Sequence, residues 1–264
     1  MKVKLMVRGI QPPHYSILAI VILASLSRPL PCSAQTSLSV SAAGSLRDAM
    51  TEVEASYKLS HAHLEFHNNF GSSGTLAIQI DQGAPADVFF SAAAKPMDDL
   101  EAKGLIVLAT RRNLLQNSLV LIAPLDSTLK SFQGLTAASV RTIALGDPAS
   151  VPAGQYGQQT LASLHLLNQL NAKLVLAKDV RQVLTYVETG NADAGLVYAT
   201  DARISTKVRI VATAPASAHD LIVYPVAVLK GTHNEAAARD FVKSLSGPAA
   251  RAIFVKCGFT IAAQ

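Results

Sequence analysis

The stretch HLEFHNNFGSSGTLAIQI, residues 63–80, places a polar turn between two segments of regular structure. Its first half predicts a β-strand over 63–70, and its apolar second half predicts a helix from Ser73 to about Gln82. Two serines and two glycines lie at the helix start, and no Lys or Arg lies within 68–80. The first turn of a helix has N–H groups without intrahelical partners, and serine hydroxyls add further donors. The stretch therefore predicts a strand–helix unit with uncharged hydrogen-bond donors at its turn.

The same succession of strand and helix recurs along the chain. Further strands are predicted over 38–44, 86–92, 117–124, 142–147, 173–179, 194–199, 208–214 and 222–229, and further helices over 45–59, 95–104, 154–168, 179–189, 234–245 and 248–256. This alternation is typical of α/β proteins whose mostly parallel sheets are covered by helices on both faces. We expect the long strands 117–124 and 222–229 to cross between two lobes. Lobe 1 would contain residues 35–118 and 226–264 and lobe 2 residues 119–225, with a ligand cleft between them.

Residues 1–34 have the organisation of a secretory signal peptide. A basic start, an apolar run at 15–26 and small residues before Gln35 predict export, with cleavage after Ala34. A retained membrane anchor and a lipoprotein cleaved before Cys32 are the alternatives. Without this segment the formal charge falls from +5 to +1, because it contains four basic residues and no acids. The remaining chain has no basic stripe typical of nucleic-acid binding, and its lone Cys257 has no partner for an intramolecular disulfide.

Four helix starts follow strand ends, and each lobe contributes two of them. Ser45 follows the first strand and Ser73 the second, whereas in the second lobe Ala153 lies in one first turn. The segment AKDVRQ places Asp179 at a helix N-cap and Val180 directly after it. Several helix starts directed into one cleft form an anion site without any cation. Each serine alone is better explained as an ordinary cap, so this prediction depends on the pairing across two lobes.

The chain resembles the periplasmic molybdate-binding proteins of molybdate ABC transporters, a type II substrate-binding family. The resemblance covers about residues 38–261 and rests on these motifs, in the family's order: AAGSLRDAM, FGSSGTLAIQI, GAPADVFFSA, GDPASVPAGQY, DVRQVLTYVE, GLVYATDA, YPVAVL and GPAARAIFVKCGF. It implies a two-lobed periplasmic-binding-protein fold, α/β in each lobe. It also implies a site between the lobes for a tetrahedral dianion, built entirely from neutral donors.

The resemblance further implies the ligand-binding residues. These are two serines that each give a hydroxyl and an amide, two residues that give a backbone N–H, and a tyrosine that gives its phenolic hydroxyl: Ser45, Ser73, Ala153, Val180 and Tyr198. Molybdenum would be bound only as molybdate through these residues, with no cofactor and no catalytic residue.

Four neighbouring residues are interpreted differently. Gly44 and Gly74 stand where relatives often have Ala or Ser, a change that leaves the donors intact. Asp147 and Arg181 are the charges nearest the second-lobe motifs, and we expect them to hold loops rather than to contact the ligand.

The expected function is therefore capture of molybdate, and of tungstate also, in the periplasm, with delivery to the membrane permease of an ABC transporter. We expect a monomer that is not an enzyme and binds no nucleic acid. Three alternatives stay open. The chain could carry sulfate or another oxyanion, or be an exported serine hydrolase, since STLK at 127–130 matches a Ser-x-x-Lys pattern without its companion motifs. His61, His63 and His67 could form a metal patch on one strand face.

Overall fold

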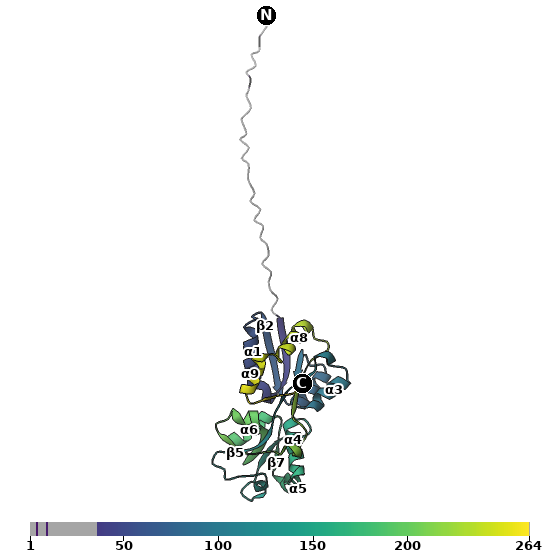
Figure 1. Cartoon of the computed structure of the whole chain (residues 1–264). Helices are drawn as coiled ribbons and strands as arrows, with labels where there is room; N and C mark the ends of the chain where they lie inside the picture. The colour runs from purple at the N-terminus through teal and green to yellow at the C-terminus, as the bar shows by residue number, and fades with distance from the viewer. Residues whose placement is uncertain (1–3, 5–8, 10–35, 264) are drawn as a thin grey trace. The chain divides into compact units, whose positions relative to one another are not determined.

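A computed structural model describes Lys4, Gly9 and residues 36–263 (Figure 1). The predicted signal peptide, residues 1–34, therefore lies outside the described residues apart from Lys4 and Gly9. Residues 36–263 form two β-sheets flanked by helices, which confirms the α/β class. Among the helices that the structure describes, none has both the length and the apolar character needed to span a bilayer.

The first sheet has the strand order β11-β4-β10-β3-β1-β2. Its strands are β1 (Thr36–Ala43), β2 (Leu64–Gly71), β3 (Val88–Phe90), β4 (Arg112–Gln116), β10 (Val223–Val228) and β11 (Thr260–Ile261). β1 pairs in parallel with β2 and β3, whereas β10 is antiparallel to β3 and β4 and β11 is antiparallel to β4. The sheet is mixed, not mostly parallel as predicted, because β10 enters it from the second half of the chain and runs against the first strands.

The second sheet has the strand order β7-β6-β8-β5-β9. Its strands are β5 (Leu119–Pro124), β6 (Ile143–Gly146), β7 (Leu174–Ala177), β8 (Ala194–Tyr198) and β9 (Val208–Thr213). β6 is parallel to β7 and β8, and β5 is antiparallel to β8 and β9. Each sheet thus contains a parallel part, where helices follow the carboxyl ends of strands, and an antiparallel part built from the strands that link the two sheets.

The helices cover both faces of each sheet. They are α1 (Arg47–Lys58), α2 (Ser73–Asp81), α3 (Ala94–Ala102), α4 (Pro152–Ser163), α5 (Leu167–Leu170), α6 (Val180–Glu188), α7 (Ala199–Arg203), α8 (Glu235–Ser244) and α9 (Pro248–Lys256). Short 3-10 helices are η1 (Gly44–Leu46), η2 (Leu108–Thr110), η3 (Gln133–Thr136), η4 (Asn171–Lys173) and η5 (Ala216–Ala218).

Successive buried side chains of the central strands contact different helices, which shows the sheet face that each helix covers. In β3, Phe89 packs with residues of α2 and α3, whereas Val88 and Phe90 belong to the larger core, which also contains buried residues of α1, α8 and α9. In the second sheet, Gly157 of α4 lies against Leu145 and Leu196. The side chains of α6 contact the opposite face. Because successive strand residues point to opposite faces, both sheets are buried on both sides.

Two segments connect the sheets. The chain leaves the first sheet at the end of β4, passes Asn117 and Ser118, and enters the second sheet as β5. It returns after β9 through residues 214–222 and joins the first sheet again as β10. Figure 1 shows these crossovers between the part that carries α1, α8 and α9 and the part that carries α4, α5 and α6.

Candidate functional site

The four predicted helix starts are present, and they meet in pairs across the two sheets. The start of α2 contacts the loop before α4, because the Gly74 N–H donates to the Ser150 carbonyl over 3.0 Å. The start of α6 contacts η1, where Arg181 lies beside Gly44. Each pair joins one element that follows the first sheet to one that follows the second.

The two adjacent serines at the start of α2 have different roles. Ser72 is the N-cap, and its Oγ accepts from the Thr75 N–H over 3.3 Å. Ser73 is fully buried, and its Oγ accepts from the Ala92 N–H over 2.8 Å. Because the cap is supplied by Ser72, the Ser73 hydroxyl is not needed to terminate the helix. Its oxygen already accepts a hydrogen bond, so its own proton is available for another acceptor.

Ser45 lies in η1, directly before α1, and is 3% exposed. Its Oγ lies 3.0 Å from the hydroxyl of Tyr224, a fully buried residue of β10. The Asn117 amide donates to the same tyrosine oxygen over 3.2 Å. The sequence motifs predicted Ser45 as a donor but did not predict Tyr224 or Asn117 beside it.

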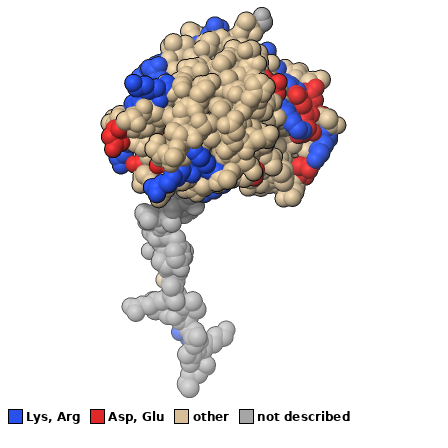
Figure 2. All heavy atoms as spheres, turned by 90° about the horizontal axis from the view of Figure 1, so that it is seen from below, with Lys and Arg blue, Asp and Glu red and all other residues tan. Residues whose placement is uncertain are grey.

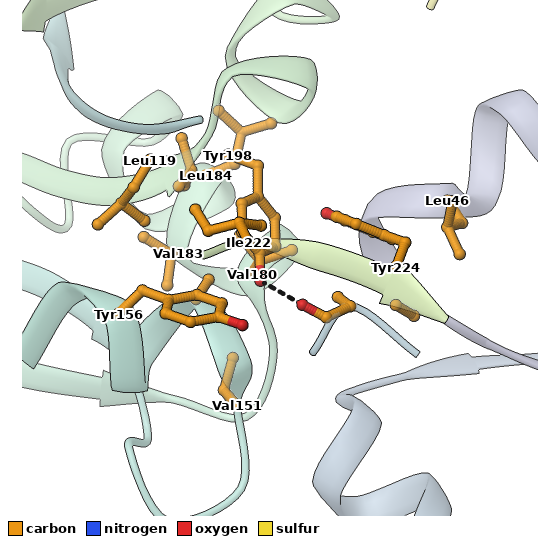
Figure 3. Packing of buried hydrophobic residues seen from close by; sticks show 14 of the residues in the cluster. Leu46, Leu119, Val151, Tyr156, Val180, Val183, Leu184, Tyr198, Ile222 and Tyr224 are labelled. Carbon is orange, nitrogen blue, oxygen red and sulfur yellow. Dashed lines mark hydrogen bonds between the residues drawn. The ribbon is translucent and has the colours of Figure 1, made fainter. Parts of the chain in front are cut away.

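Tyr198 ends β8 and is 1% exposed. Its hydroxyl donates to the Ala92 carbonyl over 3.3 Å, and its ring lies 5.7 Å from that of Tyr224. In Figure 3 the hydroxyls of Tyr156, Tyr198 and Tyr224 point toward one another. Burial raises the pKa of all three phenols well above the ordinary value. They therefore stay protonated and able to donate at neutral pH.

Ala153 and Val180 lie in the first turns of α4 and α6, and both are buried. Pro152 starts α4, and Asp179 caps α6 by accepting from the Gln182 N–H over 2.8 Å, which confirms the predicted N-cap. Gly154 allows α4 to begin against the end of β6, since a Cβ there would overlap the Gly146 carbonyl. This close approach fixes the Ala153 amide at the strand end.

The first-turn amides provide further donors. Across residues 36–263, the N–H groups of Ser45, Ser73, Ala153 and Val180 have no backbone acceptor outside their own helices. Buried N–H groups are costly when they lack an acceptor, so a buried group of this kind indicates a ligand or water. The predicted donors from both sheets, four amides and three hydroxyls, are all neutral, and the Tyr198 hydroxyl donates to the Ala92 carbonyl.

Two charged groups beside the predicted donors, Arg181 and Asp147, contact other groups of the protein. Arg181 reaches across the two halves, with Nε 2.6 Å from Asp201 and Nη2 2.6 Å from Asp48 of α1. Asp201 is fully buried, which raises its pKa to about 6 although Arg181 opposes the shift. Asp147 accepts from the Ala149 N–H and so holds the loop before α4. The observed contacts of Asp147 and Arg181 are thus with the protein.

A cavity of about 220 Å³ lies beside Ser45 and is lined by α1, α7 and α9. Arg203 and Lys256 line it together with Arg181, and Lys256 pairs with Glu52 over 2.6 Å. On the face shown in Figure 2, Lys and Arg lie in separate groups with acidic or uncharged surface between them.

The rival signals have ordinary structural explanations. His61 stacks on Tyr57 at 3.9 Å between ring centroids, and within the described residues no group of His, Cys, Asp and Glu side chains could hold a metal ion. The Ser127 hydroxyl accepts from the Leu129 N–H in a turn, and Lys130 is exposed.

The fold and this site define a class of protein: two α/β halves linked by residues 117–118 and 214–222, with buried neutral groups at the helix starts where the halves meet. The predicted strands 117–124 and 222–229 do not themselves cross, because β5 lies wholly in the second sheet and β10 wholly in the first. The chain belongs to the bacterial extracellular solute-binding protein family, whose model matches residues 38–260. It is 41% identical to the molybdate-binding protein ModA of Haemophilus influenzae, over 86% of this chain and 91% of that protein. It is 42% identical to ModA of Escherichia coli, over 85% of this chain and 89% of that protein. Among solved structures, the periplasmic molybdate-binding protein of Azotobacter vinelandii aligns with a TM-score of 0.77 at 28% identity, over 86% of this chain and all of that one.

Proposed function

We propose that this chain is an exported substrate-binding protein that captures molybdate, accepts tungstate also, and delivers the oxyanion to the permease of an ABC transporter in the bacterial envelope. The observation that carries the proposal is the set of buried neutral donors contributed by both halves of the molecule. The names of the relatives that match most of this chain support molybdate as the ligand. We also propose that the protein acts in the periplasm as a monomer, performs no chemistry on its ligand and needs no cofactor.

The donor set suits a tetrahedral dianion. A hydrogen bond to a charged acceptor contributes about 1.5–3 kcal/mol, so Ser45, Ser73, Ala153, Val180 and Tyr198 together offset the cost of dehydrating the ion. Helix starts add partial positive charge without a mobile counterion. The proposed donors include no carboxylate to accept the proton of hydrogen phosphate, which disfavours that ion.

Selectivity against sulfate follows from size. Sulfate is the smaller tetrahedron, and donors fixed by helices α2, α4 and α6 cannot all reach it. Each buried donor left unpaired costs about 1–3 kcal/mol. We therefore expect molybdate and tungstate to bind at least about 100-fold more tightly than sulfate.

Calorimetric titration of the purified protein with molybdate, tungstate, sulfate and phosphate tests this function. Ser73→Ala removes one donor to the anion and is expected to weaken molybdate binding roughly 10- to 100-fold. Ser72→Ala is the matched control, because the neighbouring serine caps the helix. It is expected to lower stability by about 1 kcal/mol and leave affinity nearly unchanged. Tighter binding of sulfate than of molybdate, or hydrolysis of an ester substrate, would reject the proposal.

A further inference from the structure

Asn117 lies in the crossover between β4 and β5, and its side chain forms hydrogen bonds to residues of both halves. Its Oδ1 accepts from the Ser118 N–H over 2.9 Å, which sets the orientation of the amide, since a backbone N–H can only donate. Its Nδ2 then donates to the Thr200 hydroxyl over 2.9 Å and to the Tyr224 hydroxyl over 3.2 Å. Both amide protons of Asn117 are thereby used.

The Asn117 contact favours one direction for the next hydrogen bond. The Tyr224 oxygen accepts from Asn117 and lies 3.0 Å from Ser45 Oγ, so its own proton can be donated to Ser45. When Tyr224 donates to Ser45, the Ser45 proton is released from the pair and is free to reach another acceptor. The opposite direction would direct the Ser45 proton back into the protein.

We propose that Tyr224 is a positioning residue for anion binding: held by Asn117, its hydroxyl donates to Ser45 and turns the Ser45 proton toward the bound oxyanion. This inference rests on the proposed function. The relay runs from Asn117 through Tyr224 to Ser45 and ends on the anion. Hydrogen bonds arranged in series polarise one another, so each donor in the relay strengthens the next.

Burial supports the relay. Tyr224 is fully buried between the Phe259 ring at 5.3 Å and the Tyr198 ring at 5.7 Å, so its hydroxyl is held in one direction. The raised pKa of Tyr224 keeps this hydroxyl protonated at any physiological pH. Ser73 has an equivalent arrangement, because the Ala92 N–H donates to its oxygen. In this arrangement each serine oxygen accepts a hydrogen bond from the protein, and the serine's own proton is available to the ligand.

The test is a double-mutant cycle on the full-length chain, with molybdate as the titrant. Tyr224→Phe keeps the ring and removes the hydroxyl, and we expect roughly fivefold to tenfold weaker binding. In the Ser45→Ala background the same substitution is expected to change affinity less than twofold, since it acts through the serine hydroxyl. Tyr57→Phe is the control, because its hydroxyl donates to Asp240 at the other end of α1. It is expected to leave affinity unchanged.

Each outcome decides the proposal. Unchanged binding in Tyr224→Phe, or an equal loss in the wild-type and Ser45→Ala backgrounds, overturns the positioning role while molybdate binding by the wild type stands. Failure of the wild type to bind molybdate overturns the proposed function itself. If Tyr224→Phe does not fold, as judged by its thermal transition, Asn117→Leu removes the donor to Tyr224 instead. A smaller loss that again disappears in the Ser45→Ala background is then expected, and an additive loss contradicts the relay.

Discussion

Glu54 is a carboxylic acid in the contact between α1 and β2. It is 6% exposed, and its Oε2 accepts from Asn68 Nδ2 over 2.7 Å, whereas Oε1 has no partner among the described residues. Burial raises its pKa from 4.5 to about 7, although the Asn68 hydrogen bond opposes the shift. Between these values the folded state keeps a proton that the unfolded chain releases. The free energy of unfolding therefore falls as pH rises from about 4.5 to 7, by at most about 3 kcal/mol from this group.

Substituting Glu54→Gln should remove this dependence and keep the acceptor for Asn68. Urea unfolding at several pH values between 5 and 8 should give a variant more stable than the wild type at pH 8 and similar to it at pH 5. The exposed Glu65→Gln on β2 serves as the control and should retain the wild-type slope. A wild-type unfolding free energy that does not decline across this range contradicts the interpretation.

At the residue scale, the sequence predicts chemistry better than it predicts orientation. The Gly-Ser-Ser-Gly turn indicates donors at a helix start. The sequence does not show which serine is the N-cap, whereas the structure assigns the cap to Ser72 and not to Ser73. Tyr224 lies 179 residues from Ser45, in β10, and Asn117 lies 72 residues from it, in the segment between β4 and β5. Their contact is a long-range property of the fold, and a single sequence has no local signal for it.

At the element scale, helix α4 ends in a Schellman motif with an unusual residue. The Leu166 N–H donates to the Leu161 carbonyl and the His165 N–H to the Ala162 carbonyl, and both leucines are buried. His165 adopts φ 57°, in the left-handed region that favours glycine. An L-residue there costs about 1 kcal/mol relative to glycine.

Replacing the exposed His165 by Gly should therefore stabilise the protein by roughly 0.5–1 kcal/mol, because the strain at the end of α4 is relieved. Chemical denaturation with an unchanged m-value is the appropriate measurement. His63→Gly, at an exposed position before β2 without this conformation, should give no gain. Destabilisation by His165→Gly would show that the histidine side chain makes a contact that outweighs its backbone strain.

Elements with a strong apolar pattern are the ones that the sequence predicts well. The predicted helix 248–256 matches α9, and 179–189 matches α6 within a residue at each end. The strand β4, RNLLQ, was not predicted because it has only two apolar residues, next to each other, and its stability comes from pairing with β10 and β11. The predicted helix 154–168 is interrupted at His165, where the Schellman motif separates α4 from α5.

At the scale of the whole molecule, we expect ligand binding to depend on how closely the two halves approach. Of the seven proposed donors, four come from the first half and three from the second, so a separation that leaves each half intact would remove one of these sets from a bound anion. Arg181 joins the halves through Asp48, and the Gly74 N–H joins them through the Ser150 carbonyl. Closure and binding are therefore expected to be coupled, because the ligand has a higher affinity for the closed arrangement.

Gly74 is a position where one added methyl group is expected to disturb the closure of the two halves. A Cβ there would lie 2.5 Å from the Ser150 oxygen and 3.0 Å from its Cα, and this neighbour is backbone. At Gly44 a Cβ would meet its nearest neighbours at 3.8 Å, an ordinary contact. The two glycines look equivalent in the sequence, where either could be replaced without loss of a donor, but only Gly74 lies at a close contact between the halves.

We therefore expect Gly74→Ala to weaken molybdate binding about tenfold, since closing the molecule must displace the Ser150 backbone. Gly44→Ala should bind within about twofold of the wild type. Calorimetry gives both affinities, and thermal unfolding without ligand separates closure from folding. Alanine favours the helix at position 74 by up to about 1 kcal/mol, so lost affinity should not be accompanied by a large loss of stability. Wild-type affinity in Gly74→Ala would mean that the approach of α2 to the 147–151 loop makes no contribution to holding the anion.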